Sequence, residues 1–103
     1  MTPKWLKTLF KLHTHPSDIQ KVSQMKNGDR LTCYEDLDGV DYNVRDVTVS
    51  NISRQPDNHF IIVWCRVARF PTDPSFAVTL ETDESGDTIL QWQQYHLRPR
   101  DTN

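Results

Sequence analysis

The chain of 103 residues has 36% hydrophobic residues and a formal net charge of −2, which predicts one small folded domain (1–103) and argues against disorder. No apolar run reaches about 18 residues and the N-terminus does not read as a secretory leader, so we expect a cytoplasmic protein without a membrane span. The charge is uneven, with six cations against two acids in residues 1–30 and six against twelve in the rest. An acidic body argues against non-specific binding to nucleic acid, which depends on a concentrated basic face.

Residues 1–26 are predicted to be a helical segment. An amphipathic helix is expected over residues 3–12, with an apolar face and a basic face formed by Trp5, Leu6, Leu9, Phe10 and Leu12 and by Lys4, Lys7 and Lys11. We expect this helix to pack on the domain's own sheet; a membrane surface and the groove of a partner are the alternatives. A second, shorter helix is predicted over residues 18–25, because Ser17 and Gln20 form a capping-box pattern.

From residue 30 onward the apolar residues alternate, which predicts a mainly β (α+β) fold. The predicted strands span residues 30–35, 40–52, 59–69, 75–82 and 88–96. A phase shift after Arg45 and Asp46 predicts a bulge or bend in the second strand. The third strand has a nearly continuous apolar centre and is expected to be the most buried, with Trp64 in the core.

These elements together predict a small five-stranded antiparallel SH3-like barrel or curled sheet over residues 30–97, with one or two N-terminal helices. The last residues, 98–103, are expected to form a flexible tail. Cys33 and Cys65 both fall in strand-like runs and belong to no CxxC pair. They are predicted to be buried reduced thiols on neighbouring strands; the alternative, a disulfide, would require an oxidising compartment.

Two histidines one residue apart, followed by a serine, occur at His13, His15 and Ser23. This spacing resembles the JAMM (MPN-type) metalloprotease motif, in which an aspartate three residues after the serine completes the zinc site. Here that position is Lys26, and the twelve residues before His13 contain no acid that could serve as the catalytic base. A catalytic zinc needs three protein ligands and a neighbouring base. We therefore predict that these residues form a linker and not a metal site. We also expect no cofactor and a protein that is not an enzyme.

The acidic residues Glu35, Asp36, Asp38 and Asp41 surround Gly39. They lack the closing bidentate glutamate of a calcium loop, so a hairpin turn is predicted, with the acids available to a basic partner. Our first hypothesis is a protein-binding regulator or inhibitor of the kind that mobile elements encode. Aromatic anchors ringed by charge are typical of interface hot spots, and the predicted contact residues are Trp92, Tyr95, Tyr42, Asp36, Asp38 and Asp41.

A second pattern combines an apolar residue and a tyrosine, an acid-glycine turn, an Arg-x-Val strand, an aromatic central strand ending in cysteine, and a closing strand with phenylalanine. Its positions are Leu31, Tyr34, Asp38-Gly39, Arg45-Asp46-Val47, Phe60 to Cys65 and Phe76-Ala77-Val78. Over residues 30–81 this resembles the WYL domain, the SH3-like sensory module of bacterial transcription regulators and defence-associated proteins.

The resemblance implies an alternative function, the binding of a nucleotide-type ligand or single-stranded nucleic acid. It assigns the anion contacts to Arg45, Arg66 and Arg69, with Tyr34 or Phe76 as the stacking aromatic. The chain departs from the family at Ser75 and Ala77, where arginines flank the closing-strand phenylalanine, and it shows no upstream helix-turn-helix. Those departures put the basic pocket of the family in doubt for this chain.

Overall fold

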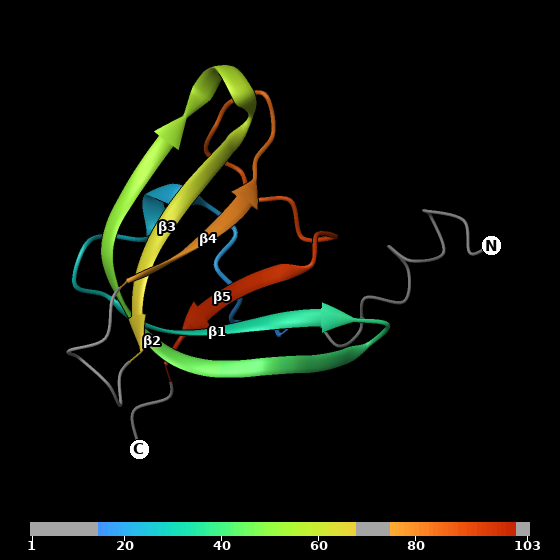
Figure 1. Ribbon diagram of the computed structural model, residues 1–103. Coiled ribbons are helices and arrows are strands. Elements are labelled where there is room, and N and C mark those ends of the chain that lie inside the picture. The colour runs from blue at the N-terminus through green and yellow to red at the C-terminus, as the bar shows by residue number, and fades with distance from the viewer. Residues whose placement is uncertain (1–14, 68–74, 101–103) are drawn as a thin grey trace.

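A computed structural model describes residues 15–67 and 75–100 and is mainly β (Figure 1). One antiparallel sheet has the strand order β4-β3-β2-β1-β5, which confirms the prediction of five antiparallel strands. Among the described residues, no helix has the length and apolar character needed to span a membrane. The elements are β1 (Arg30–Leu37), β2 (Val40–Gln55), β3 (Phe60–Val67), β4 (Phe76–Glu81), β5 (Tyr95–Pro99) and two 3₁₀ turns, η2 (Val22–Gln24) and η3 (Pro56–Asn58).

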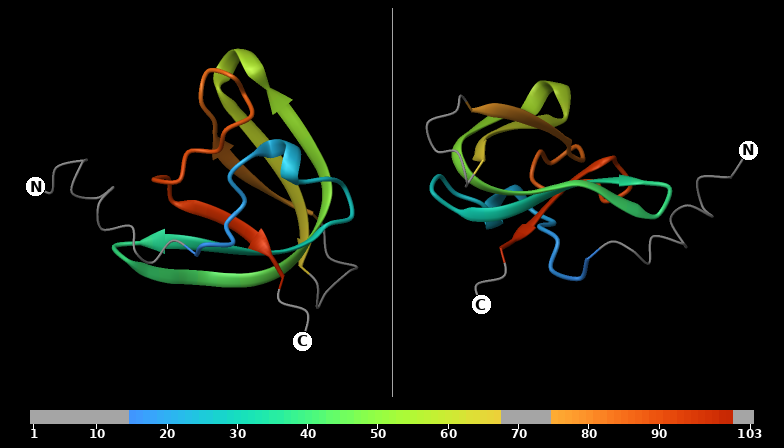
Figure 2. Two further views of the ribbon diagram at one scale, coloured as in Figure 1. Left: turned by 180° about the vertical axis from the view of Figure 1, so that it is seen from behind. Right: turned by 60° about the horizontal axis from the view of Figure 1, so that its bottom comes forward.

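The sheet curls strongly but does not close, because its edge strands β4 and β5 do not pair with each other. Two irregular segments, residues 18–22 and 82–90, lie between these edges (Figure 2). The Ile19 N–H donates to the carbonyl of Leu97 on β5 at 2.8 Å, and the Leu90 N–H donates to the carbonyl of Glu81 at the end of β4 at 3.0 Å. The segments also share a β-bridge. Hydrogen bonds from irregular backbone thus satisfy part of both sheet edges.

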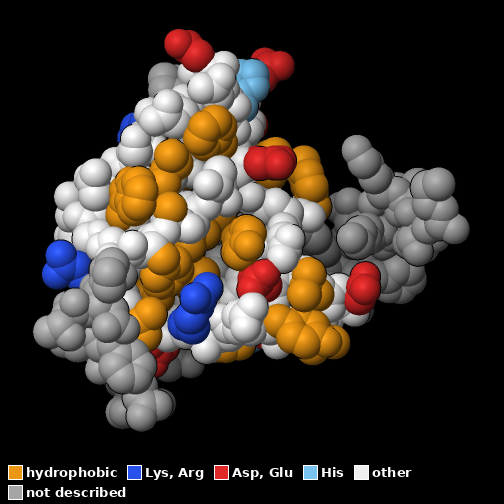
Figure 3. All heavy atoms as spheres, in the orientation of Figure 1, with side chains coloured by type: hydrophobic (Ala, Val, Ile, Leu, Met, Phe, Trp, Pro, Cys, Tyr) orange, Lys and Arg blue, Asp and Glu red, His pale blue; other side chains and the backbone are white. Residues whose placement is uncertain are grey.

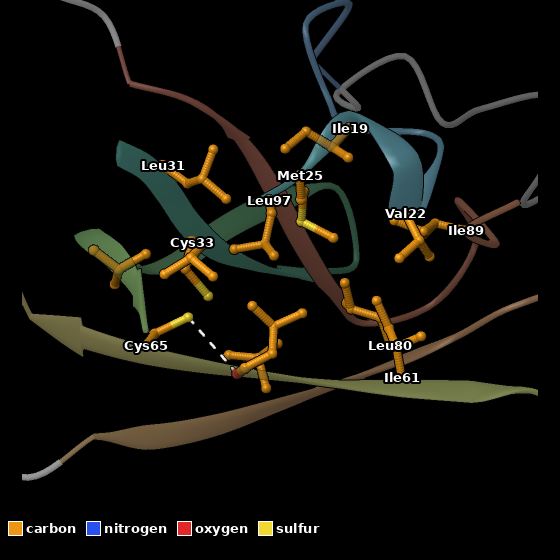
Figure 4. Packing of buried hydrophobic residues seen from close by; sticks show 14 residues of the cluster. Ile19, Val22, Met25, Leu31, Cys33, Ile61, Cys65, Leu80, Ile89 and Leu97 are labelled. Atoms are coloured by element: carbon orange, nitrogen blue, oxygen red, sulfur yellow. Dashed lines mark hydrogen bonds between the residues drawn. The ribbon is translucent and has the colours of Figure 1, made fainter. Parts of the chain in front are cut away.

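The core lies inside the curl, between β1 and β5 on one side and β3 and β4 on the other (Figure 4). Strand β3 contributes alternate residues to it, since Ile61 and Val63 are buried whereas Trp64 is 37% exposed. The prediction that β3 is the most buried strand is wrong, since four of the eight residues of β1 are buried and only three of the eight of β3. The prediction that Trp64 lies in the core is wrong as well. One face of a half-covered sheet faces the interior and the other faces solvent, so burial follows the two-residue period of the strand.

The predicted helix over residues 18–25 is not formed, because only Val22–Gln24 make a 3₁₀ turn. The flanking residues Lys21 and Met25 have extended backbones. The Val22 N–H donates to the carbonyl of Asp87 at 2.8 Å, so it is bound to a distant segment and not to the preceding turn. Apolar residues three apart are still buried here, but through extended backbone. The helix predicted over residues 3–12 lies outside the described residues.

The last strand begins and ends later than predicted. Residues 88–94 form bridges and turns, and β5 spans Tyr95–Pro99. Arg98 and Pro99 are therefore part of the sheet, and the Arg100 N–H donates to the carbonyl of Arg30 at 3.2 Å. The expectation of a flexible tail from residue 98 is wrong for 98–100; residues 101–103 lie outside the described part of the chain.

Both cysteines are buried and unpaired, which confirms the predicted thiols. Their strands are not neighbours, however, because β2 lies between β1 and β3. Burial is the main cause that raises the pKa of Cys33 to about 11 and that of Cys65 to about 12. Both thiols are therefore protonated at neutral pH and enclosed by the core.

We expect neither Cys33 nor Cys65 to react with a thiol reagent at about pH 8 in the native protein, and both to react after unfolding, because the thiolate is the nucleophile. The contribution of these thiols to the free energy of unfolding is present in full below about pH 8.5, the pKa of a cysteine in the unfolded chain. It is lost as the pH rises toward the pKa values of about 11 and about 12 in the folded protein. Mass spectrometry after timed alkylation counts the labelled thiols. Rapid labelling of either cysteine in the folded protein would contradict its position in the core.

Candidate functional site

The β1–β2 hairpin extends beyond the strands on either side of it. Strand β3 pairs with β2 only from Val47 onward, and β5 pairs with β1 only as far as Glu35. Among the described residues, the hairpin arm, defined here as residues 35–45, therefore has no third strand along most of its length. Figure 1 shows it projecting from the body of the sheet. A two-stranded ribbon is stabilised little by its own pairing, so its side chains face solvent unless something covers them.

The turn and twist of the arm follow from local sequence. Asp38 and Gly39 both have positive φ, 52° and 87°, as a tight two-residue hairpin turn requires. A register shift then places Asn43 and Val44 opposite Tyr34, with Asn43 at a φ of 51°. This bulge precedes the predicted site of the bend after Arg45 and Asp46. A second shift in β2, between Val49 and Asn51, follows it.

One face of the arm is apolar and exposed. Of the six exposed large hydrophobic side chains among the described residues, four belong to this hairpin: Leu37, Val40, Tyr42 and Val44. Leu37 pairs across the strands with Val40, and Glu35 pairs with Tyr42. Since cross-strand partners and residues two apart share a face, Leu37, Val40 and Tyr42 form one surface, the hairpin face. Figure 3 shows hydrophobic side chains gathered at this end of the molecule, with acidic side chains beside them.

The hairpin face continues onto β5 and the turn before it. Glu35 pairs with Tyr42 on one side and with Tyr95 on the other, so the two tyrosines occupy one row with a carboxylate between them. Gln94 donates to Glu35 at 2.6 Å. Trp92 lies in the same turn and is 58% exposed. The structure thus brings Tyr42 and Tyr95 together, with Trp92 in the adjoining turn; Tyr95 is partly buried against the core.

The predicted acidic contacts lie elsewhere on the arm. Asp36 and Asp41 are cross-strand partners on the face opposite Tyr42, and Asp38 lies in the turn. His15 Nε2 is 2.9 Å from Asp41 Oδ2, so the imidazole lies on the face that carries the facing carboxylates. Tyr42 and the pair Asp36 and Asp41, which the sequence grouped, therefore lie on opposite faces of the arm.

A buried polar cluster fixes residues 15–18 against the back of β1 and β5. The Tyr34 hydroxyl donates to Asp18 Oδ2 at 2.6 Å, and the ring of His96 stacks on Tyr34 with centroids 5.1 Å apart. All three residues are buried. Burial, followed by the hydrogen bond to Asp18, raises the pKa of Tyr34. Sequence reasoning missed Asp18 and His96, because no local spacing connects residues so far apart in the chain.

The residues assigned to an anion site are only partly brought together. The Arg45 guanidinium lies 4.5 Å from the centroid of the Phe76 ring. Tyr34 is fully buried and bound to Asp18, so it cannot stack on a ligand in this structure. Arg66 follows the inward-facing Cys65, is exposed, and donates to the Ser75 hydroxyl at 3.4 Å. Arg69 lies outside the described residues.

The histidine motif does not assemble in the part of the chain that is described. His15 bonds to Asp41, whereas the Ser23 hydroxyl donates to Asp87 at 3.3 Å. His13 lies outside the described residues. Residues 15–67 and 75–100 contain no group of three or more His, Cys, Asp or Glu side chains that could hold a metal ion.

Comparison of the chain with protein-family models, with curated proteins and with solved structures finds no match.

Proposed function

We propose that the chain is a non-enzymatic interaction protein that binds another protein through the hairpin face. The observation that carries the proposal is the concentration of exposed large hydrophobic side chains on one projecting arm. Isolated exposed apolar residues are ordinary, but a contiguous exposed group is typical of an interaction site. Tyr95 and the exposed Trp92 extend this surface with aromatic side chains, which contribute strongly to interfaces.

The proposal also includes the fold class and the cellular role that are expected from the sequence. The fold is assigned to the small SH3-like barrels, which is supported by the curled sheet and by the irregular segments between its edges. The role is that of a cytoplasmic regulator or inhibitor of the kind that mobile elements encode. It is supported by the small size of the chain and by a candidate site that is an exposed surface and not an enclosed cavity.

Replacing Val40 or Tyr42 by serine is expected to weaken binding of the partner by about 10- to 100-fold. Complete burial of such a side chain contributes about 1.5–3 kcal/mol, and 1.4 kcal/mol corresponds to a tenfold change in Kd. The partner is first captured by the full chain from a lysate of the source cells, and its Kd for each variant is then measured by calorimetry. Because both side chains are exposed, the variants should retain the wild-type circular dichroism spectrum.

The matched control is Trp64→Ser, which removes an exposed aromatic side chain from β3, outside the arm. This variant should bind the partner with the wild-type Kd. Equal weakening by Trp64→Ser and by Tyr42→Ser, with intact folds, would show that the hairpin face is not the specific site.

One observation supports the second candidate, a WYL-like module that binds a nucleotide-type ligand. Arg45 and Phe76 are already in contact and could together hold a phosphate and a base. Titration with nucleotides and short oligonucleotides at low salt tests it, since phosphate binding weakens steeply as salt rises. The absence of any binding at low salt rules this candidate out.

A further inference from the structure

The hairpin arm carries a strong local negative charge. Its carboxylates outnumber its cations by four to one, which gives a net charge of −3 in residues 35–45. The cation is Arg45, whose guanidinium is directed onto the ring of Phe76 and so toward β4. The screening length at physiological salt is about 8 Å, which is comparable with the roughly 10 Å spacing of packed sheet layers. The acids on both faces therefore contribute to the potential at the hairpin face.

One carboxylate is fixed within the apolar surface itself. Glu35 lies between Tyr42 and Tyr95 in the cross-strand row. The side-chain amides of Asn43 and Gln94 both donate to it. A partner that buries Leu37, Val40 and Tyr42 must therefore also cover or approach this carboxylate, which would be unfavourable unless the partner supplies a cation.

The same charge makes a second hairpin face a poor occupant. Two copies packed arm to arm would bring two groups of net charge −3 together around apolar surfaces, and like charges at an interface oppose association. A neutral apolar partner would gain free energy by burying the apolar side chains, but it would also remove water from the Glu35 carboxylate, which opposes binding. A cationic partner gains the hydrophobic contact and the attraction together.

We propose that the occupant of the hairpin face is a basic segment of another protein, in which apolar side chains alternate with lysine or arginine. Its apolar side chains cover Leu37, Val40 and Tyr42, and its cations pair with Glu35 and with the acids near the turn. This inference rests on the proposed function and specifies the chemistry of the partner. Attraction of this kind also speeds association, because it steers the basic segment toward the arm.

The test uses the full chain and two short fluorescent peptides, one built of Lys and Leu and a twin with Glu in place of Lys. Affinity is measured by fluorescence anisotropy at about 0.15 M and about 1 M salt, where the Debye length falls from about 8 Å to about 3 Å. We expect the lysine peptide to bind, its affinity to fall at high salt, and the glutamate twin not to bind. Equal binding of both peptides overturns the proposal.

A double variant, Asp36→Asn with Asp38→Asn, removes two charges and keeps the turn, because asparagine tolerates a positive φ and retains the side-chain acceptor that Asp36 offers to the Gly39 N–H. It should bind the lysine peptide about 3- to 10-fold more weakly. The charge-matched control, Asp57→Asn with Glu84→Gln, changes exposed acids outside the arm and should leave the affinity unchanged. An equal effect of the two pairs overturns the proposal.

The chain's own basic segment, residues 1–14, is the alternative occupant of the hairpin face. Trp5→Ser with Phe10→Ser removes two large apolar side chains from that segment without changing its charge. Unchanged peptide affinity supports the proposal, whereas a tenfold rise shows that the segment competes for the hairpin face and overturns it. If Val40→Ser abolishes binding of the natural partner while the charge variants and salt have no effect, the proposed function stands and this inference fails.

Discussion

Replacing Ile61 by alanine is expected to lower the free energy of unfolding by about 2–5 kcal/mol, the usual cost of removing a large aliphatic side chain from a packed core. Ile61 is 1% exposed and lies on the inner face of β3. Denaturant unfolding followed by tryptophan fluorescence measures the change.

The adjacent residue provides the control. Ile62 is the same residue type on the same strand, but it faces outward and is only partly buried. Ile62→Ala should therefore cost about 1 kcal/mol or less. Equal losses at positions 61 and 62 would mean that both faces of β3 are covered, and would contradict the arrangement in which one face of β3 points to the core and the other to solvent.

Replacing Tyr34 by phenylalanine is expected to lower the free energy of unfolding by about 1–3 kcal/mol, because it removes the hydrogen bond to Asp18 and leaves a buried carboxyl group without its closest donor. His96 Nδ1, 3.5 Å from Asp18 Oδ2, is a poor substitute at that distance. The ring of Tyr34 and its packing are retained, so the change reports on the polar contact.

Tyr42→Phe is the matched control, since it makes the same change in a residue that is 48% exposed and lies on the arm, outside the buried cluster. This variant should change the stability by less than about 0.5 kcal/mol. Both are measured by denaturant unfolding at neutral pH. Should Tyr34→Phe prove as neutral as Tyr42→Phe, the buried cluster would not be what fixes residues 15–18 to the sheet.

The fold was predictable to the extent that it depends on local patterns. Alternation located β1 to β4 within a few residues, and the Asp38-Gly39 pair located the hairpin turn. The helix over 18–25 was wrong because apolar residues three apart are buried equally well by an extended segment whose N–H groups bind distant carbonyls. β5 was shifted because Thr88 and Ile89 form isolated bridges with Lys21 and Thr82 and a turn follows them, which no local pattern shows.

The sequence predicted Tyr42 of the hairpin face but not Leu37 or Val40, and it did not predict their arrangement. Tyr42 and the acids could be named from the sequence, yet the faces on which they lie depend on the bulge at Asn43 and Val44 and on the cross-strand register. The exposure of Leu37 and Val40 depends on where β3 and β5 stop pairing, which is a property of the whole sheet. The burial of Tyr34 likewise requires Asp18 and His96 from opposite ends of the chain.

Amide hydrogen exchange of the full chain, with and without the captured partner, tests the central claim most directly. We expect added protection to be confined to the hairpin arm, residues 35–45, and to the adjoining turn, residues 90–95. The backbone amides of β3 and β4 should exchange at the same rate in both states. Protection of β3 and β4 with an unchanged hairpin arm would contradict the assignment of the hairpin face as the binding surface.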